Sequence, residues 1–202
     1  KKAYMDQTGN VAEINFILIN MLKVAGIDVN PVLVSTIENG VPVYPTRTGF
    51  NYVIAAAEID GKQILLDASR KYTYPGILPL NVLNWKGRLI KDDGTSKEIN
   101  LVPTTTSKEF SNLMVKVDKT GKIEGKIRIQ RTDYEAYDFR IENADKNQEN
   151  YLEKLERRLG DLKVSNYNIE NKKNNLQDPV VETFSFTSDN KPDIIGGKIY
   201  LN

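Results

Sequence analysis

The sequence of 202 residues contains no cysteine and no histidine. Without cysteine there can be no disulfide, no thiolate ligand for zinc and no cysteine nucleophile. Without histidine the chain lacks the usual general base at neutral pH and the commonest ligand of transition metals. Any catalysis would have to use carboxylates, lysine, tyrosine, serine or threonine, and we expect neither a metal site nor a cofactor.

An excess of charge of either sign is also missing, since 28 Lys and Arg residues balance 27 Asp and Glu residues. Nucleic-acid-binding proteins usually carry a basic excess, so we expect no nucleic-acid partner. No apolar run approaches the roughly 20 residues of a membrane helix, and the longest, Phe16–Leu22, is interrupted by Asn20. The length suffices for one large domain or two small ones with a hydrophobic core.

The two ends of the sequence are typical of a piece cut from a longer protein. The chain starts at Lys1-Lys2-Ala3-Tyr4 without a methionine, and it stops inside the strand-like run Lys198–Leu201. We therefore expect flanking domains, and any targeting segment would lie outside this piece.

The first half predicts a helix followed by a sheet. Val11–Val24 is apolar on nearly every side, which predicts a central, buried helix, and Gly26 is a natural residue to end it. Asp60-Gly61 predicts a tight hairpin turn between two strands. The predicted strands of this half are Pro31–Thr36, Phe50–Glu58, Gln63–Asp67, Lys86–Ile90 and Lys97–Leu101.

After a boundary near residue 100 the pattern changes to strands with an inserted helical segment. Asp133–Gly160 has apolar residues at helical spacing with charges between them. The predicted strands of this half are Asn112–Val117, Lys122–Arg131, Lys163–Ile169, Val180–Thr187 and Lys198–Leu201. We therefore expect an α+β protein in which residues 1–100 form a helix packed on an antiparallel sheet. Residues 101–202 would form a mostly β domain with a helical insertion, cut short at its end.

Five segments in the first half follow the order of a known fold. They are Gly9–Asn15, Ala25-Gly26-Ile27, Pro31–Thr36, Phe50–Ile54 and Leu65–Ser69. In this order and spacing the chain resembles the transglutaminase-like core, which is related to the papain-like cysteine proteases. The resemblance is closest to exported bacterial multidomain proteins whose flanking β domains have no known function, and it implies that the early helices of the core precede Lys1.

The resemblance implies where the catalytic residues of that family would fall. The family's cysteine opens the helix, its histidine lies on the second strand and its aspartate on the third, which correspond here to Val11, Tyr52 and Asp67. Valine has no nucleophilic atom, and a phenol with a pKa of about 10 is a poor base at neutral pH. We therefore expect a degenerate active site, with Asp67 hydrogen-bonded to Tyr52 or to backbone N–H groups.

Aromatic residues cluster in the segments expected around the cleft of such a core. Aromatic side chains can stack on sugars or grip peptides, and they can equally anchor a connection to the core. The candidate cleft-binding residues are Glu13, Tyr44, Phe50, Tyr52, Tyr74 and Trp85.

Three functions remain open from the sequence. The first is a catalytically inactive transglutaminase-like protein that binds a peptide or a glycan, or acts as a scaffold. The second is a hydrolase that uses Asp67, Glu13 or Tyr52 in the same cleft, which requires a carboxylate with a raised pKa. The third is a structural spacer between other domains. The resemblance implies a periplasmic or cell-surface location.

Overall fold

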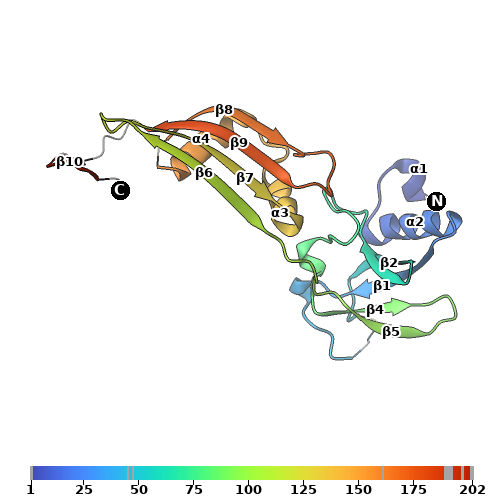
Figure 1. Cartoon of the computed structure of the whole chain (residues 1–202). Coiled ribbons are helices and arrows are strands. Elements are labelled where there is room, and N and C mark those ends of the chain that lie inside the picture. The colour runs from blue at the N-terminus through green and yellow to red at the C-terminus, as the bar shows by residue number, and fades with distance from the viewer. Residues whose placement is uncertain are drawn as a thin grey trace. The chain divides into compact units, whose positions relative to one another are not determined.

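The computed structural model describes residues 2–44, 46, 48–160, 162–188, 193–196 and 198–200. These residues form four α-helices, a five-stranded and a four-stranded antiparallel sheet, and a short two-stranded ribbon (Figure 1). The predicted α+β class is confirmed. The chain divides into two compact units, Lys1–Thr106 and Ser107–Asn202, which we call the first and the second unit.

The first unit is built on the five-stranded sheet, whose strand order is β3-β2-β1-β4-β5. The turn between β2 and β3 has positive φ angles at both Asp60 and Gly61, as a tight hairpin turn requires. The strands are β1 (Asp28–Val34), β2 (Tyr52–Ile59), β3 (Lys62–Leu66), β4 (Lys86–Ile90) and β5 (Ser96–Asn100).

Two helices precede the sheet, the short α1 (Lys2–Asp6), which the sequence did not predict, and α2 (Val11–Val24), which it did. Asn10 caps α2: its side-chain oxygen accepts a hydrogen bond from the Glu13 N–H at 2.9 Å, and the Glu13 carboxylate accepts one from the Asn10 N–H at 2.8 Å. This reciprocal pair fixes the residue at which the helix begins.

Strand β2 is covered on both faces, which explains its run of apolar residues. On one face Ala55 and Ala57 pack with Ile19 of α2. On the other face Ile54 and Ala56 pack in a cluster with Leu78 and Val82 of the connection between β3 and β4. That connection, predicted from its aromatic residues and prolines, contains the short 3-10 helix η2 (Leu80–Val82).

Helix α2 is less buried than its composition indicated. Only Asn15 and Ile19 are fully buried, whereas Phe16, Met21 and Val24 are exposed in the part of the chain that the structure describes. A helix that lies on one face of a sheet can bury only the side turned toward it. The prediction of a centrally buried helix is therefore wrong, because apolar residues all round a helix do not supply a second layer to cover it.

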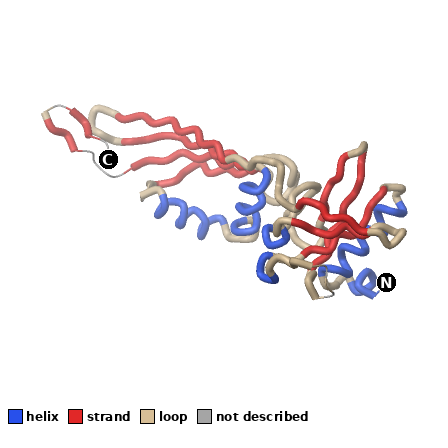
Figure 2. The backbone as a smooth tube through the Cα atoms, turned by 90° about the horizontal axis from the view of Figure 1, so that it is seen from below, coloured by secondary structure: helices blue, strands red, loops and turns tan. Residues whose placement is uncertain are grey.

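The second unit has the four-stranded antiparallel sheet, in the order β6-β7-β9-β8, with two helices on one face (Figure 2). The sequence predicted one helical segment, but Asn147 caps a new helix with a 2.8 Å hydrogen bond from the Glu149 N–H. The elements are β6 (Glu109–Val117), β7 (Ile123–Arg131), α3 (Asp133–Asn143), α4 (Gln148–Arg158), β8 (Lys163–Glu170) and β9 (Val180–Ser188).

A two-stranded ribbon follows, formed by β10 (Asp193–Ile195) and β11 (Lys198–Tyr200). Strand β11 was predicted to run to Leu201, which lies outside the described residues, and β10 was not predicted. No helix in the described ranges has both the length and the hydropathy needed to cross a membrane.

Candidate functional site

Val11 lies at the start of α2, directly after the capping residue Asn10. The N-terminus of a helix carries a partial positive charge from its unpaired N–H groups. The Val11 side chain is partly buried and packs against the core cluster that contains Tyr52. The position therefore has the electrostatic setting that would activate a thiol, but it holds an inert side chain.

Tyr52 and Asp67 lie in direct contact. Tyr52 is the first residue of β2, and Asp67 follows β3, which pairs with β2. The Tyr52 hydroxyl donates a hydrogen bond to Asp67 Oδ2 at 2.8 Å and lies 2.9 Å from Ser69 Oγ. The structure thus brings together the two residues that the resemblance placed at the histidine and aspartate positions.

Both oxygens of the Asp67 carboxylate are satisfied by hydrogen bonds. Oδ1 accepts from the Ser69 N–H at 2.6 Å, from Ser69 Oγ at 2.7 Å and from Asn15 Nδ2 at 3.2 Å, while Oδ2 accepts from Tyr52. Asp67 is only 7% exposed. A carboxylate whose two oxygens are both used in this way has no free oxygen turned toward a ligand.

Burial raises the pKa of Tyr52 to about 12, with the charge of the nearby Asp67 acting in the same direction. The phenol therefore stays protonated near neutral pH and serves as a hydrogen-bond donor. It cannot take a proton from a nucleophile, which is the task of the histidine in a transglutaminase-like active site.

A cavity of about 700 Å³ opens at the start of α2. Its walls come from Asn10, Val11 and Ala12 of the helix start, from Leu33 of β1, and from Thr46 and the segment 50–53 that leads into β2. We call this cavity the α2 cleft. Most of its walls are apolar, and a hydroxyl and amide side chains line the remainder.

Only some of the predicted cleft residues line the α2 cleft. Phe50 and Tyr52 do, as does Val11. The Glu13 carboxylate is used in the helix cap, and the exposed Tyr44 is not among the walls.

The remaining two predicted cleft residues lie in the connection between β3 and β4. Tyr74 pairs with Ile77 in a β-bridge within that connection. Trp85 is exposed, and the centre of its ring lies 4.6 Å from Lys86 Nζ. It lines a separate small cavity of about 40 Å³ together with Phe50. Neither side chain is a wall of the α2 cleft.

Sequence reasoning missed Asn15, which ties the site together. Its side chain is fully buried; Nδ2 donates to the Val53 carbonyl at 2.8 Å, and Oδ1 accepts from the Ala68 N–H at 2.8 Å. The available signal was its spacing, because Asn15 lies four residues from both Val11 and Ile19 on the buried side of α2. A polar residue on that side needs partners, and here they belong to the segments that carry Tyr52 and Asp67.

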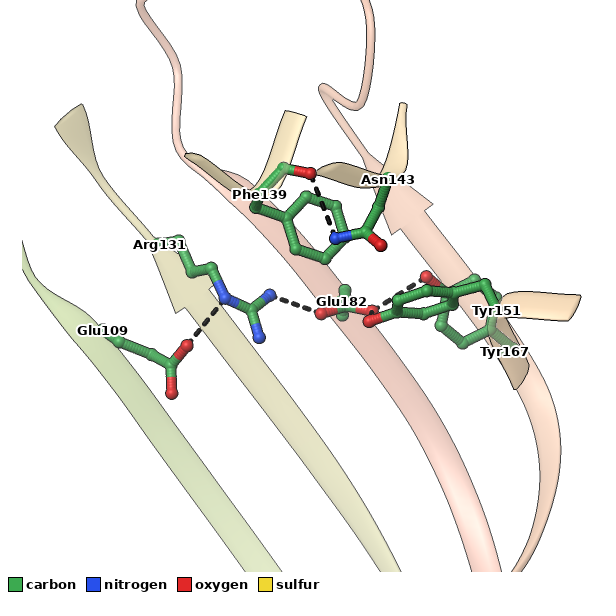
Figure 3. Close-up of polar contacts among 7 residues, drawn as sticks. All are labelled: Glu109, Arg131, Phe139, Asn143, Tyr151, Tyr167 and Glu182. Atoms are coloured by element: carbon green, nitrogen blue, oxygen red, sulfur yellow. Dashed lines mark hydrogen bonds and ion pairs between the residues drawn. The ribbon is translucent and has the colours of Figure 1, made fainter. Parts of the chain in front are cut away.

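The second unit contains a buried charged cluster that the sequence analysis also missed (Figure 3). Glu182 of β9 is fully buried and accepts hydrogen bonds from Arg131, from Tyr151 at 2.6 Å and from Tyr167 at 2.8 Å. Arg131 also donates to Glu109 at 2.7 Å. We call these five residues the Glu182 cluster. The sequence feature that could have revealed it is a glutamate on the inward side of β9, on the same face of the strand as Phe184.

Three members of the Glu182 cluster, Arg131, Tyr151 and Tyr167, have raised pKa values. Burial alone would lower the pKa of Arg131, but the hydrogen bond and charge of Glu182 raise it above its ordinary value. Burial raises the pKa of Tyr151 and Tyr167, and the charge of Glu182 and its hydrogen bonds raise both further. The cluster is therefore an ion pair with two neutral phenols, an arrangement that joins a helix to the strands.

Comparisons with protein-family models, with curated proteins and with solved structures give no match for this chain. The functional interpretation therefore rests on the geometry of the α2 cleft and of the second unit.

Proposed function

We propose that the first unit is a catalytically inactive transglutaminase-like core that works as a binding module at the bacterial cell envelope, with the α2 cleft as its site. The observation that carries the proposal is that Val11 and Tyr52 line one cavity beside a helix N-terminus, while the Tyr52 hydroxyl is hydrogen-bonded to Asp67 behind the cavity wall. A cleft that is retained around residues unable to react is suited to binding without turnover.

The contacts of the acidic residues argue against a hydrolase that uses the same cleft. A general acid needs a carboxylate that is free to exchange a proton and has room for substrate beside it. Asp67 is buried under four hydrogen bonds, and the Glu13 carboxylate accepts the N–H of its own helix cap. Neither group is available for that role.

The walls of the α2 cleft favour a peptide over a glycan as the ligand. Val11, Leu33 and Phe50 offer apolar surface, and no carboxylate lines the cavity within the described residues. An apolar peptide side chain would bury its surface against these residues, whereas a sugar needs several directed polar partners.

A titration with a capped peptide tests the binding function. We expect acetyl-Gln-Leu-amide to bind the full chain, as monitored by NMR chemical shifts of Ala12 and Phe50. Thr46→Trp should fill the cleft and weaken binding at least about tenfold, whereas Thr48→Trp, two residues away and not in the walls, should leave binding unchanged. Absence of binding by the unmodified chain would favour the spacer function instead.

A crosslinking assay tests the loss of catalysis. Incubation of the chain with a glutamine peptide and a labelled amine should give no product above the blank, because Val11 supplies no nucleophile. Product formation that depends on the chain would contradict the proposal whatever the binding result.

A further inference from the structure

The two helices of the second unit face each other across a cavity of about 310 Å³ that has charged walls. Helix α3 contributes an acidic row at helical spacing, formed by Glu135, Asp138 and Glu142. Helix α4 contributes Lys154 and Arg158, also on one face. We call this cavity the α3–α4 pocket.

The two charged rows do not neutralise each other. Among the described residues, none of the three α3 carboxylates forms an ion pair within 4.0 Å with Lys154 or Arg158. Opposite charges are thus held apart across a space large enough for a small ligand.

Arg131 of the Glu182 cluster lines the same pocket. Its Nε and Nη1 atoms donate to Glu109 and Glu182 (Figure 3), and its guanidinium carbon lies 4.7 Å from the centre of the Phe139 ring. Arg131 is thus a fixed part of the pocket wall whose charge is already paired, which leaves Lys154 and Arg158 as the cations available to a ligand.

We propose that the α3–α4 pocket binds a small zwitterion of dipeptide size, with its ammonium group toward the acidic row of α3 and its carboxylate toward Lys154 and Arg158. A simple anion or cation would be attracted by one row and repelled by the other, whereas separated opposite charges match both. Phe139 and Leu155 line the same pocket and offer apolar surface to the uncharged body of the ligand. This inference concerns the second unit and does not depend on the α2 cleft.

The test is a titration of the full chain with glycyl-leucine at low ionic strength, followed by NMR chemical shifts of α3 and α4. Acetyl-glycyl-leucine lacks the ammonium group and glycyl-leucine amide lacks the carboxylate, so each should bind at least about tenfold more weakly. Free leucine reports whether one residue suffices. Equal binding of the capped forms, or no binding of glycyl-leucine at about 10 mM, would overturn the proposal.

Matched variants on α3 and α4 test whether the ligand binds in the α3–α4 pocket. Arg158→Gln should weaken glycyl-leucine binding about tenfold, whereas Arg157→Gln removes the same charge outside the pocket and should leave binding unchanged. Asp138→Asn should weaken binding similarly, with Glu153→Gln as its control. All four positions are exposed, and circular dichroism checks that each variant is folded. Equal losses in the pocket variants and the controls would mean a general charge effect and would contradict the assignment.

Discussion

The hydroxyl group of Tyr52 supplies the only described donor to Asp67 Oδ2. Tyr52→Phe would leave that buried oxygen without a partner, and we expect a loss of about 1–3 kcal/mol in the free energy of unfolding. Urea unfolding measures the change. Tyr44→Phe is the control, because Tyr44 is exposed and should tolerate the loss of its hydroxyl. A similar stability for both variants would mean that the Tyr52–Asp67 contact contributes nothing.

Because the chain has no cysteine, a single introduced thiol can report the electrostatic field at the start of α2. In Val11→Cys the helix N-terminus should lower the thiol pKa below its usual value of about 8.5. The pH dependence of alkylation by iodoacetamide gives that pKa. Val24→Cys places the same thiol at the opposite end of α2, where the pKa should not be lowered. A Val11→Cys thiol no more acidic than the Val24→Cys thiol would contradict this account of the site.

The contact between Tyr52 and Asp67 could be predicted from sequence, because paired strands β2 and β3 carry both residues to one place. The partners of Asn15 and Glu182 could not be predicted from the sequence. A pattern analysis marks an inward polar residue as an interruption, and only the packed structure shows which distant groups satisfy it. Thr46 and Asn51, which also line the α2 cleft, were missed for the same reason, since loop positions follow from packing.

At the scale of elements, two ion pairs of Arg131 in the Glu182 cluster join β7 to β6 and to β9. Arg131→Met would leave Glu182 buried without its cation, and we expect a loss of about 3–5 kcal/mol in the free energy of unfolding. Arg131→Met/Glu182→Gln should lose less than the two single variants together, because it removes the unpaired charge and keeps an acceptor for the tyrosines. A double-mutant cycle by urea unfolding gives the coupling. Additive losses would show that the pair is not coupled.

The helices show which features the sequence pattern predicts and which it misses. The apolar run of α2 predicted both of its ends, because Asn10 and Gly26 supply the local signals. The break between α3 and α4 was missed because the charged pattern continues across it. The cap at Asn147 creates a second helix axis, and the α3–α4 pocket exists only because of that change of direction.

At the scale of the whole molecule, the raised pKa values of three tyrosines predict that the folded chain loses stability at high pH. Tyr52, Tyr151 and Tyr167 all have a pKa in the folded chain above the unfolded value of about 10. The unfolded chain therefore releases these protons first, so the stabilisation is complete below pH 10 or so and is lost as the pH rises toward 12. Thermal unfolding between pH 8 and 12 measures this, and Tyr52→Phe should reduce the dependence. A stability that is constant across this range would contradict the prediction.

The division into two units carries a further consequence for unfolding. Each unit has its own hydrophobic clusters, with Ile54 and Val32 in the first and Phe184 and Leu155 in the second. Two separate cores are expected to unfold in two transitions rather than one.

Variants in each core assign those transitions. Tyr52→Phe should move one midpoint in urea and Arg131→Met the other, with each variant leaving the second midpoint unchanged. Tryptophan fluorescence identifies the first unit, because Trp85 is the single tryptophan of the chain. Circular dichroism follows both units. A shift of both midpoints by one variant would contradict this prediction. It would mean that the units stabilise each other, so that loss of the ion pair at Arg131 would also lower the stability of the first unit.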